Sequence, residues 1–264
     1  PLSVFLVYVA TCCLWTPLMP LTDAYALRGV LSYGLDYGRL RLWGSAAFIV
    51  GSLLCGGLID TIPRVGLIWI IVAAGLVGAF ASLALQPLDR PSRAAVVMPE
   101  GRGLLRDATF ICIILSAALA QGSHAAYYAF SAIDWQAQGL DGLTIAWLWT
   151  IGVLAEIVVF ALSARFTLVP ADLVVIGAAT AVLRWVLTAQ ELQVAALIPI
   201  QLSHGLTFGL TQVGLMGLLL RYVPAHMTAR GQGYYAASGG IVGSAASVLS
   251  GVVYAHYGQG VYYM

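Results

Sequence analysis

Residues 142–164 read GLTIAWLWTIGVLAEIVVFALSA, and Glu156 is the only charged side chain in this run. The next apolar run, residues 173–190, reads LVVIGAATAVLRWVLTAQ, and Arg184 is its only charged side chain. Each run has about the length that a helix needs to cross a bilayer. A charge at the middle of a bilayer costs at least ~2.5–3.5 kcal/mol, so a chain keeps one mainly where it has a partner or a function.

The composition of the whole chain agrees with these two runs. Of its 264 residues, 61% are hydrophobic and 9% are charged, and the mean hydropathy is +0.91. Soluble domains carry about 25% charged residues. The apolar runs are continuous and do not alternate with period two, which excludes a membrane barrel. We therefore predict an all-α integral membrane protein.

Several functional classes find no support in the sequence. The net charge of +1 gives no reason to expect a nucleic-acid partner. The four cysteines lack the spacing of a disulfide framework or a metal site, so we expect buried free thiols. No metal-ligand cluster, phosphate-binding glycine loop or nucleophile motif is present, and we expect neither a metal nor a cofactor.

Segments of about 20 apolar residues indicate the membrane spans. We expect eight of them, with these approximate bounds: 1–25, 42–60, 66–86, 108–133, 143–163, 172–189, 193–220 and 232–256. A charged connection that contains proline separates the third span from the fourth. We interpret residues 88–107 as a linker between two helical bundles, 1–87 and 108–264.

The arginines indicate how the chain is oriented in the membrane. The odd-numbered loops between these spans hold Arg28, Arg39, Arg41, Arg90, Arg93, Arg102, Arg106, Arg165, Arg221 and Arg230, whereas the even-numbered loops hold only Arg64. By the positive-inside rule the odd-numbered loops are cytoplasmic. We expect a multi-pass protein of a bacterial inner membrane.

Glu156 and Arg184 are expected to lie at similar depth. At ~1.5 Å per residue they sit ~14 Å and ~18 Å from the cytoplasmic ends of their helices. An acid and a base on adjacent spans could be a permanent ion pair that holds two helices together. They could also exchange partners when substrate or proton binds, which is what a proton-coupled carrier requires.

The seventh span carries a polar stripe. Gln201, His204, Phe208 and Thr211 follow helical spacing on one face. A polar face on an apolar span should turn toward protein or water. His204 is therefore either a cavity-lining residue or a neutral histidine that is hydrogen-bonded between helices.

The fourth span carries a longer stripe, which combines hydrogen-bonding groups with aromatic faces. Its members are Gln121, His124, Tyr128, Ser131 and Trp135. Such a face would suit an aromatic ring with a carboxylate or hydroxyl tail. Trp135 lies near the predicted outer end, where an aromatic interface belt is the simpler explanation.

A possible inner gate lies near the cytoplasmic end of the first span. Asp23 could bind a proton, or it could pair with Arg28 or Arg41. We favour the pairing, because the acid is close to basic loop residues and would be only partly desolvated.

Three stretches carry a family resemblance: PLMPLTDA at 17–24, DYGRLRLWGS at 36–45 and HAAYYAFSAI at 124–133, together with the pairs Ala155-Glu156 and Arg184-Trp185. The sequence resembles the phenylpropionate permease branch of the major facilitator superfamily, relatives of lactose permease and the nucleoside–proton symporters. The resemblance implies a bundle of twelve helices, of which these eight would be the fourth to the eleventh. Residues 261–264 would begin the twelfth.

The resemblance also implies roles for particular residues. In lactose permease relatives an acid on the eighth helix and an arginine on the ninth belong to the coupling and binding machinery, and Glu156 and Arg184 look like their counterparts. The tenth helix of sugar-symporting relatives carries a histidine and, three residues on, an acid. His204 matches that histidine, but Thr207 stands where the acid would be.

The function that we predict is transport, not catalysis. A proton symporter would import a small organic solute, most readily an aromatic carboxylate such as phenylpropionate, by alternating access and as a monomer when full length. Coupling would involve Glu156, Arg184 and His204, and substrate would meet His124, Tyr128, Gln121, Ser131, Gln201 and Arg184. A nucleoside or sugar symporter is the alternative. A membrane-embedded enzyme or assembly factor is the alternative from another class.

Overall fold

The structure of the protein is a computed structural model. It describes residues 2–18, 21–22, 25–26, 33–35, 37–59, 61–85, 103–224 and 227–264, and the side chains of 37–39, 41, 64–65 and 228–229 are not described. Within these ranges the regular structure is helical. The helices are α1 (Leu2–Trp15), α3 (Tyr37–Leu58), α4 (Arg64–Leu83), α5 (Ala108–Gly122), α6 (Ala125–Ala137), α7 (Gly142–Leu162), α8 (Pro170–Thr188), α9 (Val194–Leu202), α10 (Thr211–Tyr222) and α11 (Thr228–Tyr257).

Short helical segments extend or join several of these helices. They are η1 (Leu104–Arg106), η2 (Ser163–Arg165), η3 (Gly205–Leu210) and η5 (Gly258–Tyr263). Two helix starts follow directly from sequence chemistry. The Asp107 carboxylate accepts from the backbone N–H groups of Thr109 and Phe110 and so caps α5. Pro170 begins α8, at the position where a missing N–H costs nothing.

The predicted fold class is confirmed. Within the described ranges, six helical segments are long and apolar enough to cross a membrane: 66–83, 108–137, 142–165, 170–188, 194–222 and 230–263. Shorter apolar helices cover 2–15 and 42–58. All eight fall on the predicted spans. A continuous helix is the natural solution there, because it satisfies its own backbone hydrogen bonds where no water is available.

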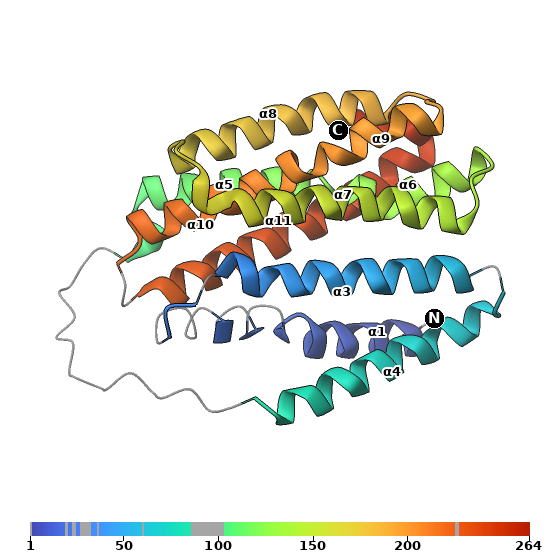
Figure 1. The fold of residues 1–264 in the computed structure, drawn as a ribbon, viewed down its shortest axis with the longest axis horizontal. Helices are drawn as coiled ribbons and strands as arrows, with labels where there is room; N and C mark the ends of the chain where they lie inside the picture. Colours follow the sequence, from blue (N-terminus) through green and yellow to red (C-terminus); the bar gives the residue numbers. More distant parts are fainter. Residues whose placement is uncertain are drawn as a thin grey trace.

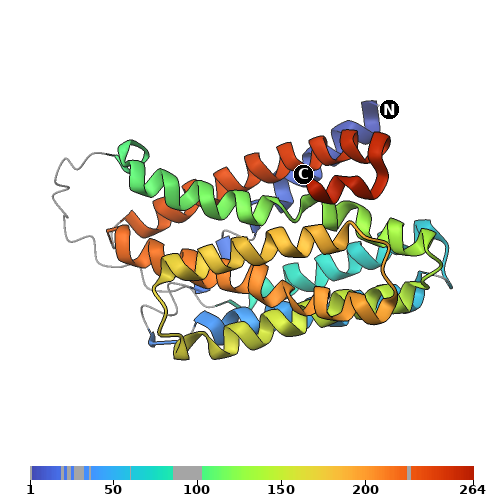
Figure 2. The same cartoon turned by 90° about the horizontal axis from the view of Figure 1, so that it is seen from above.

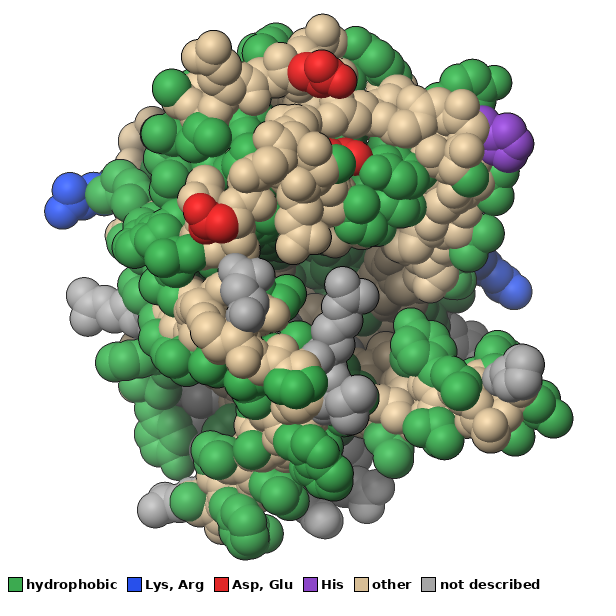
Figure 3. Space-filling model, turned by 90° about the vertical axis from the view of Figure 1, so that its right-hand side faces the viewer, with side chains coloured by type: hydrophobic (Ala, Val, Ile, Leu, Met, Phe, Trp, Pro, Cys, Tyr) green, Lys and Arg blue, Asp and Glu red, His purple; other side chains and the backbone are tan. Residues whose placement is uncertain are grey.

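The helices from α5 onward pack around one another, and the earlier helices lie on one side of them (Figures 1 and 2). Among these earlier helices, α3 makes extensive contact with α7. By contrast, α1 has no buried residue. Figure 3 looks at the end that carries the α6–α7 connection, where apolar side chains cover the flanks and charged side chains are few. The division into two bundles at 88–107 stays a prediction, since most of that linker lies outside the described residues.

The fourth predicted span is interrupted in its middle. Helix α5 ends at Gly122 and α6 starts at Ala125, with Ser123 and His124 between them. A Gly-Ser pair is a common cause of such a break. The Ser123 hydroxyl donates to the carbonyl of Ala120 at 2.7 Å and so competes with the regular helix pattern. His124 lies at this break, and its side chain is fully buried within the bundle.

The seventh predicted span is also irregular. It consists of α9, a π-helical segment η3 and α10, and Pro199 lies inside α9. π-helical turns shift the register of a helix and often occur at functional sites. Thr207 is buried, and Phe208 is half-buried. The ring of Phe208 stacks on that of His204 with 5.3 Å between ring centres, so the two lie on the same side of this span.

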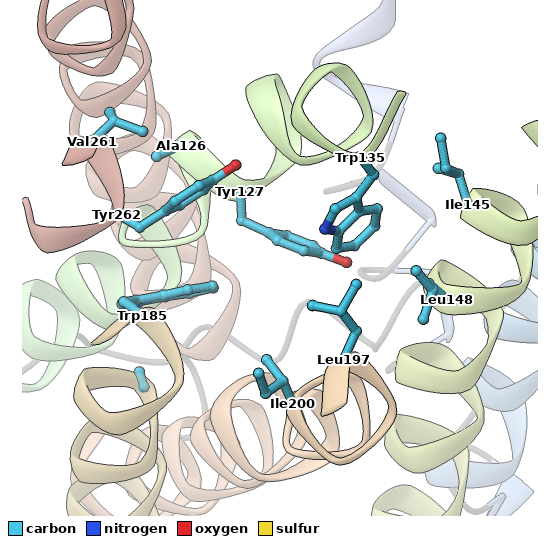
Figure 4. Close-up of a cluster of buried hydrophobic side chains, with 11 residues drawn as sticks. Ala126, Tyr127, Trp135, Ile145, Leu148, Trp185, Leu197, Ile200, Val261 and Tyr262 are labelled. Carbon is cyan, nitrogen blue, oxygen red and sulfur yellow. The ribbon is translucent and has the colours of Figure 1, made fainter. Parts of the chain in front are cut away.

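Two apolar clusters fill the interior. One contains Phe110, Ile114 and Leu215 near the start of α5, and the other contains Tyr127, Trp135 and other residues near the ends of α6 and α8. Figure 4 shows the ring of Trp135 turned inward next to Tyr127, and it is only 3% exposed. The explanation of Trp135 as an interface-belt residue is therefore wrong, because it packs within the protein. The cysteines also differ from expectation: they are free, but Cys13, Cys55 and Cys112 are exposed.

Candidate functional site

Arg184 is the most deeply buried charged group of the site, and only 1% of it is exposed. Its Nη1 donates to Nδ1 of His204 at 2.9 Å and to Oγ1 of Thr207 at 3.2 Å. Its Nη2 donates to Oε1 of Gln201 at 3.1 Å. Burial of a charge is tolerable only with such partners. All three acceptors come from one short stretch, residues 201–207, which covers the end of α9, the start of η3 and His204 between them.

Aromatic rings enclose the same guanidinium group. Its central carbon lies 4.7 Å from the ring centre of Tyr127 and 4.8 Å from that of Trp185. Such contacts stabilise a cation that has lost its water. The Tyr127 hydroxyl also donates to Oε1 of Gln201 at 2.8 Å, so this amide oxygen receives two donors. Tyr127 therefore holds both Arg184 and Gln201 in place.

Glu156 is connected to this cluster through His204. Nε2 of His204 lies 3.6 Å from Oε2 of Glu156. On the other side, the hydroxyl of Ser45 on α3 donates to Oε1 of Glu156 at 3.2 Å. The buried acid is thus contacted from helix α3 as well as from the later helices. The predicted pair of Glu156 and Arg184 shares one neighbour, the imidazole of His204.

His124 completes the network on the far side of Arg184. Its Nδ1 lies 3.2 Å from the carbonyl oxygen of Ala120, and its Nε2 lies 3.1 Å from Oγ1 of Thr207. Because a carbonyl can only accept, Nδ1 of His124 carries a proton. Oγ1 of Thr207, three residues after His204, thus lies between the guanidinium of Arg184 and the imidazole of His124. We call the connected set the polar chain: Ser45, Glu156, His204, Arg184, Gln201, Tyr127, Thr207 and His124.

A cavity of about 470 Å³ opens beside the polar chain. Most of its lining is aromatic or small, and the carboxyl group of Glu156 and the imidazole of His204 belong to both the lining and the polar chain. The lining residues are Gly44, Ser45, Phe48, Tyr127, Tyr128, Trp149, Gly152, Val153, Glu156, His204 and Phe208. Its volume lies within the range of small-molecule sites, about 300–1,000 Å³. Arg184 is not part of the lining, but its guanidinium lies 4.7 Å from the ring centre of Tyr127, which is.

Several buried polar atoms of the site find no hydrogen-bond partner among the described residues. They include Nε of Arg184 and the amide nitrogen of Gln201. Since nearly all buried polar groups are paired in folded proteins, unpaired donors indicate a place where water or a ligand oxygen can bind. Both groups belong to the polar chain.

The remaining predicted binding residues lie around this centre. Tyr128 lines the cavity and is 46% exposed. Ser131 is buried, and its hydroxyl has no partner among the described residues. Gln121 does not reach the cavity. It lines a separate groove of about 440 Å³ between α5, α6 and α11, together with Tyr128.

The predicted gate cannot be placed. Asp23 and Arg28 lie outside the described residues, and the side chain of Arg41 on α3 is not described.

The sequence reasoning did not identify several members of the site. Tyr127 precedes the predicted Tyr128, and Trp185 follows Arg184, so both were visible as aromatic neighbours of polar residues. Ser45 belongs to the stretch 36–45 that carries the family resemblance, but neither it nor Trp149 was predicted as a site residue. Their roles depend on how α3 and α7 pack together, which helical spacing within one segment cannot show.

Comparisons with known proteins agree with this architecture. The family model described as "MFS_1 like family" matches residues 2–264. The chain is 34% identical over 268 residues to the "Probable 3-phenylpropionic acid transporter" of Escherichia coli (strain K12), an alignment that covers 95% of this chain and 67% of that protein. It is 26% identical over 231 residues to the "Maltose permease" of Geobacillus stearothermophilus, covering 86% and 58%.

The chain therefore spans about two thirds of the length of the first relative and less of the second. In the comparison with solved structures, none matches significantly.

Proposed function

The chain belongs to the MFS_1 like family, and from this premise we propose that it forms part of a secondary transporter that moves a small aromatic carboxylate together with a proton. The observation that carries this proposal is a carboxyl group, Glu156, on the wall of an aromatic-lined cavity inside the membrane-spanning bundle. The similarity to a protein named as a 3-phenylpropionic acid transporter supports the choice of substrate class.

The cavity suits an aromatic ring that carries a short polar tail. Phe48, Tyr128, Trp149 and Phe208 offer ring faces and edges, which pack favourably against another aromatic ring. The tail would lie toward Glu156 and His204 at the polar end. A cavity of this kind, mostly apolar with a few placed polar groups, is typical of small-molecule sites.

Proton coupling follows from the charges at the polar end. Two carboxylates that share one desolvated site repel, so one of them holds a proton. A carboxylate substrate would therefore bind beside a protonated Glu156. The substrate and the proton of Glu156 would then cross the membrane together. Substrate binding should accordingly weaken as the pH rises and Glu156 loses its proton.

The test is Glu156→Gln in the whole protein reconstituted in liposomes. The amide keeps the shape but cannot release a proton. We expect exchange of labelled for unlabelled 3-phenylpropionate to continue, and accumulation driven by a proton gradient to be lost. Glu191→Gln, at an exposed carboxylate between α8 and α9, is the matched control and should accumulate substrate normally. Accumulation against a gradient by Glu156→Gln would disprove the proton role.

A sugar or nucleoside symporter is the second candidate. The similarity to a maltose permease favours it, as do the hydrogen-bonding groups of Gln201, Thr207 and His124 beside the cavity. The amide of 3-phenylpropionic acid separates the candidates, since it keeps the ring and the shape but carries no charge. Binding of the acid and not of the amide supports a carboxylate carrier, whereas binding of maltose or a nucleoside supports the alternative.

The proposed setting is a bacterial inner membrane, with the odd-numbered loops in the cytoplasm. The partners would be the substrate, the proton and the lipid bilayer, and the transport unit would be a monomer of the whole protein. The concentration of arginine in the odd-numbered loops supports this orientation.

A further inference from the structure

We propose that Arg184 is a positioning residue that holds His204 in the form with its single proton on Nε2. In this form His204 presents a hydrogen-bond donor to the cavity and does not carry the transported proton, which resides on Glu156. This inference rests on the proposed function, because it assigns roles within the same site.

The contact between Arg184 and His204 fixes which ring nitrogen of His204 is the acceptor. A guanidinium group has donors only, so the nitrogen that it contacts must accept. Nη1 of Arg184 lies 2.9 Å from Nδ1 of His204, a normal hydrogen-bond distance. Nδ1 therefore has no proton, and a neutral His204 carries its proton on Nε2, the nitrogen nearer Glu156.

A second proton on His204 would have to bind Nδ1, where the N–H of Arg184 already points. That hydrogen bond would be lost, and two positive groups would face each other in a site that excludes water. Like charges in contact disfavour ionisation strongly when they are desolvated. Glu156 has no such obstacle, because a proton on it removes a buried charge.

The titratable groups that face His204 among the described side chains fit this assignment. Glu156 approaches from α7 and Arg184 from α8, and the ring of His124, next to α6, lies 5.5 Å away between ring centres. Helix α3 contributes the uncharged Ser45, which contacts Glu156. His124 is bonded to Thr207 and Ala120. The proton that can move at this site is thus the one on Glu156.

Nε2 of His204 lies 3.6 Å from Oε2 of Glu156, which is longer than a hydrogen bond, and both side chains line the cavity. The N–H of His204 can therefore donate to an oxygen of a bound carboxylate while Glu156 is protonated. Arg184 contributes through His204, because it contacts His204 but does not itself line the cavity.

Nitrogen NMR of the whole protein with ¹⁵N-labelled histidine tests the assignment directly, because protonated and unprotonated ring nitrogens resonate far apart. The resonances of His204 are identified as those that vanish in His204→Gln. We expect an unprotonated Nδ1 and a protonated Nε2 throughout about pH 5 to 8, the range in which an ordinary histidine titrates. A proton on Nδ1 anywhere in this range would overturn the proposal.

Arg184→Gln supplies the second measurement. A neutral side chain no longer opposes protonation, so His204 should titrate within the same pH range. A purely structural role of Arg184 would leave the protonation of His204 unchanged in any variant that folds, and that result would count against the proposal. The wild-type titration decides the question if the variant does not fold.

Ligand binding gives an independent readout through two replacements of His204. The amide nitrogen of glutamine lies about where Nε2 was, and that of asparagine about where Nδ1 was. We expect His204→Gln to bind 3-phenylpropionate at least about tenfold more tightly than His204→Asn, the loss typical of a hydrogen bond to a charged group. Equal affinities, or tighter binding by His204→Asn, would contradict the proposal. The NMR result does not depend on transport, so it can fail while the proposed function stands.

Discussion

Helices α4 and α7 are equally apolar and yet differ completely in their surroundings. Their best membrane-length windows have the same mean hydropathy, but no residue is buried in that of α4, against 44% in that of α7. Of these two helices, α7 contains a buried charged side chain, Glu156. Hydropathy thus predicts that both helices lie in the membrane. Packing and polar contacts decide which of them can contribute to a binding site.

The largest expected effect comes from removing the buried cation. Arg184→Leu removes the donor to Nδ1 of His204 and one donor each to Gln201 and Thr207. Breaking a buried charge network in this way costs about 3–5 kcal/mol. The free energy of unfolding, measured in detergent micelles, should fall by that amount.

Leu183→Ala is the control for this prediction, since Leu183 is exposed on the same helix. It should change stability by less than about 0.5 kcal/mol. The double variant Arg184→Leu with Glu156→Leu should recover part of the loss, because it also removes the desolvation cost of the buried carboxylate. Equal stability of Arg184→Leu and wild type would mean that the polar chain does not stabilise the bundle.

A glycine pair tests the packing half of the comparison. A Cβ at Gly205 in η3 would lie 2.6 Å from the carbonyl oxygen of Ala155 on α7, whereas a Cβ at Gly75 on α4 meets nothing within 4 Å. Gly205→Val should cost about 3 kcal/mol or more, because backbone would have to move. Gly75→Val should be nearly neutral. Thermal unfolding of the two variants measures the difference, and similar losses would show that α4 is packed as tightly as α7.

A third prediction concerns the connection between α6 and α11. Both carboxylate oxygens of Asp134 accept from phenols, of Tyr254 and Tyr262, at 2.6 Å. Asp134→Asn retains one acceptor and so loses one of these bonds, at a cost of about 1 kcal/mol. The unfolding midpoint in urea should fall accordingly. Tyr257→Phe, at a tyrosine that is 75% exposed, is the control, and a comparable loss there would refute a specific role for Asp134.

The smallest expected effect lies at the start of α7 and depends on pH. The carboxylate of Asp141 accepts from the backbone N–H and the hydroxyl of Thr144, and these bonds lower its pKa below the ordinary value. A lowered pKa in the folded state adds stability above the ordinary pKa, and this is lost as the pH falls through the lowered pKa. Helix α4 has no side-chain cap of this kind at its start.

Melting curves at several pH values check this prediction. Asp141→Ala should be slightly less stable than wild type at neutral pH and should converge with it in acid. Asp141→Asn can still accept from the backbone of Thr144, and its stability should not share this pH dependence. A constant difference between Asp141→Ala and wild type at all pH values would exclude the carboxylate as the cause.

Some features of the site were predictable from single residues. Glu156 and Arg184 stand alone in long apolar runs, and the cost of an isolated charge in a bilayer is enough to predict partners for both. His204 and Gln201 follow from helical spacing in the same way. The intermediate position of His204 between the acid and the base was not predicted, because it depends on how α7 and α8 pack against the span that carries His204.

One other expectation failed because it rested on position along a single helix. Trp135 was placed at the membrane interface by its nearness to a helix end, but its ring packs against Tyr127 inside the protein. Tyr127 became a central residue of the site, although its neighbour Tyr128 fitted the predicted stripe better.

The sequence alone determined that this protein is a bundle of membrane helices, because the hydrophobic effect and the need for internal backbone hydrogen bonds act on each segment separately. It also determined which spans contain charges that require partners. Only the tertiary structure decided that Arg184 meets His204, that Glu156 faces a cavity together with Ser45 of α3, and that α4 packs so differently from α7. These facts concern the directions and distances between side chains on different helices, which no property of a single segment contains.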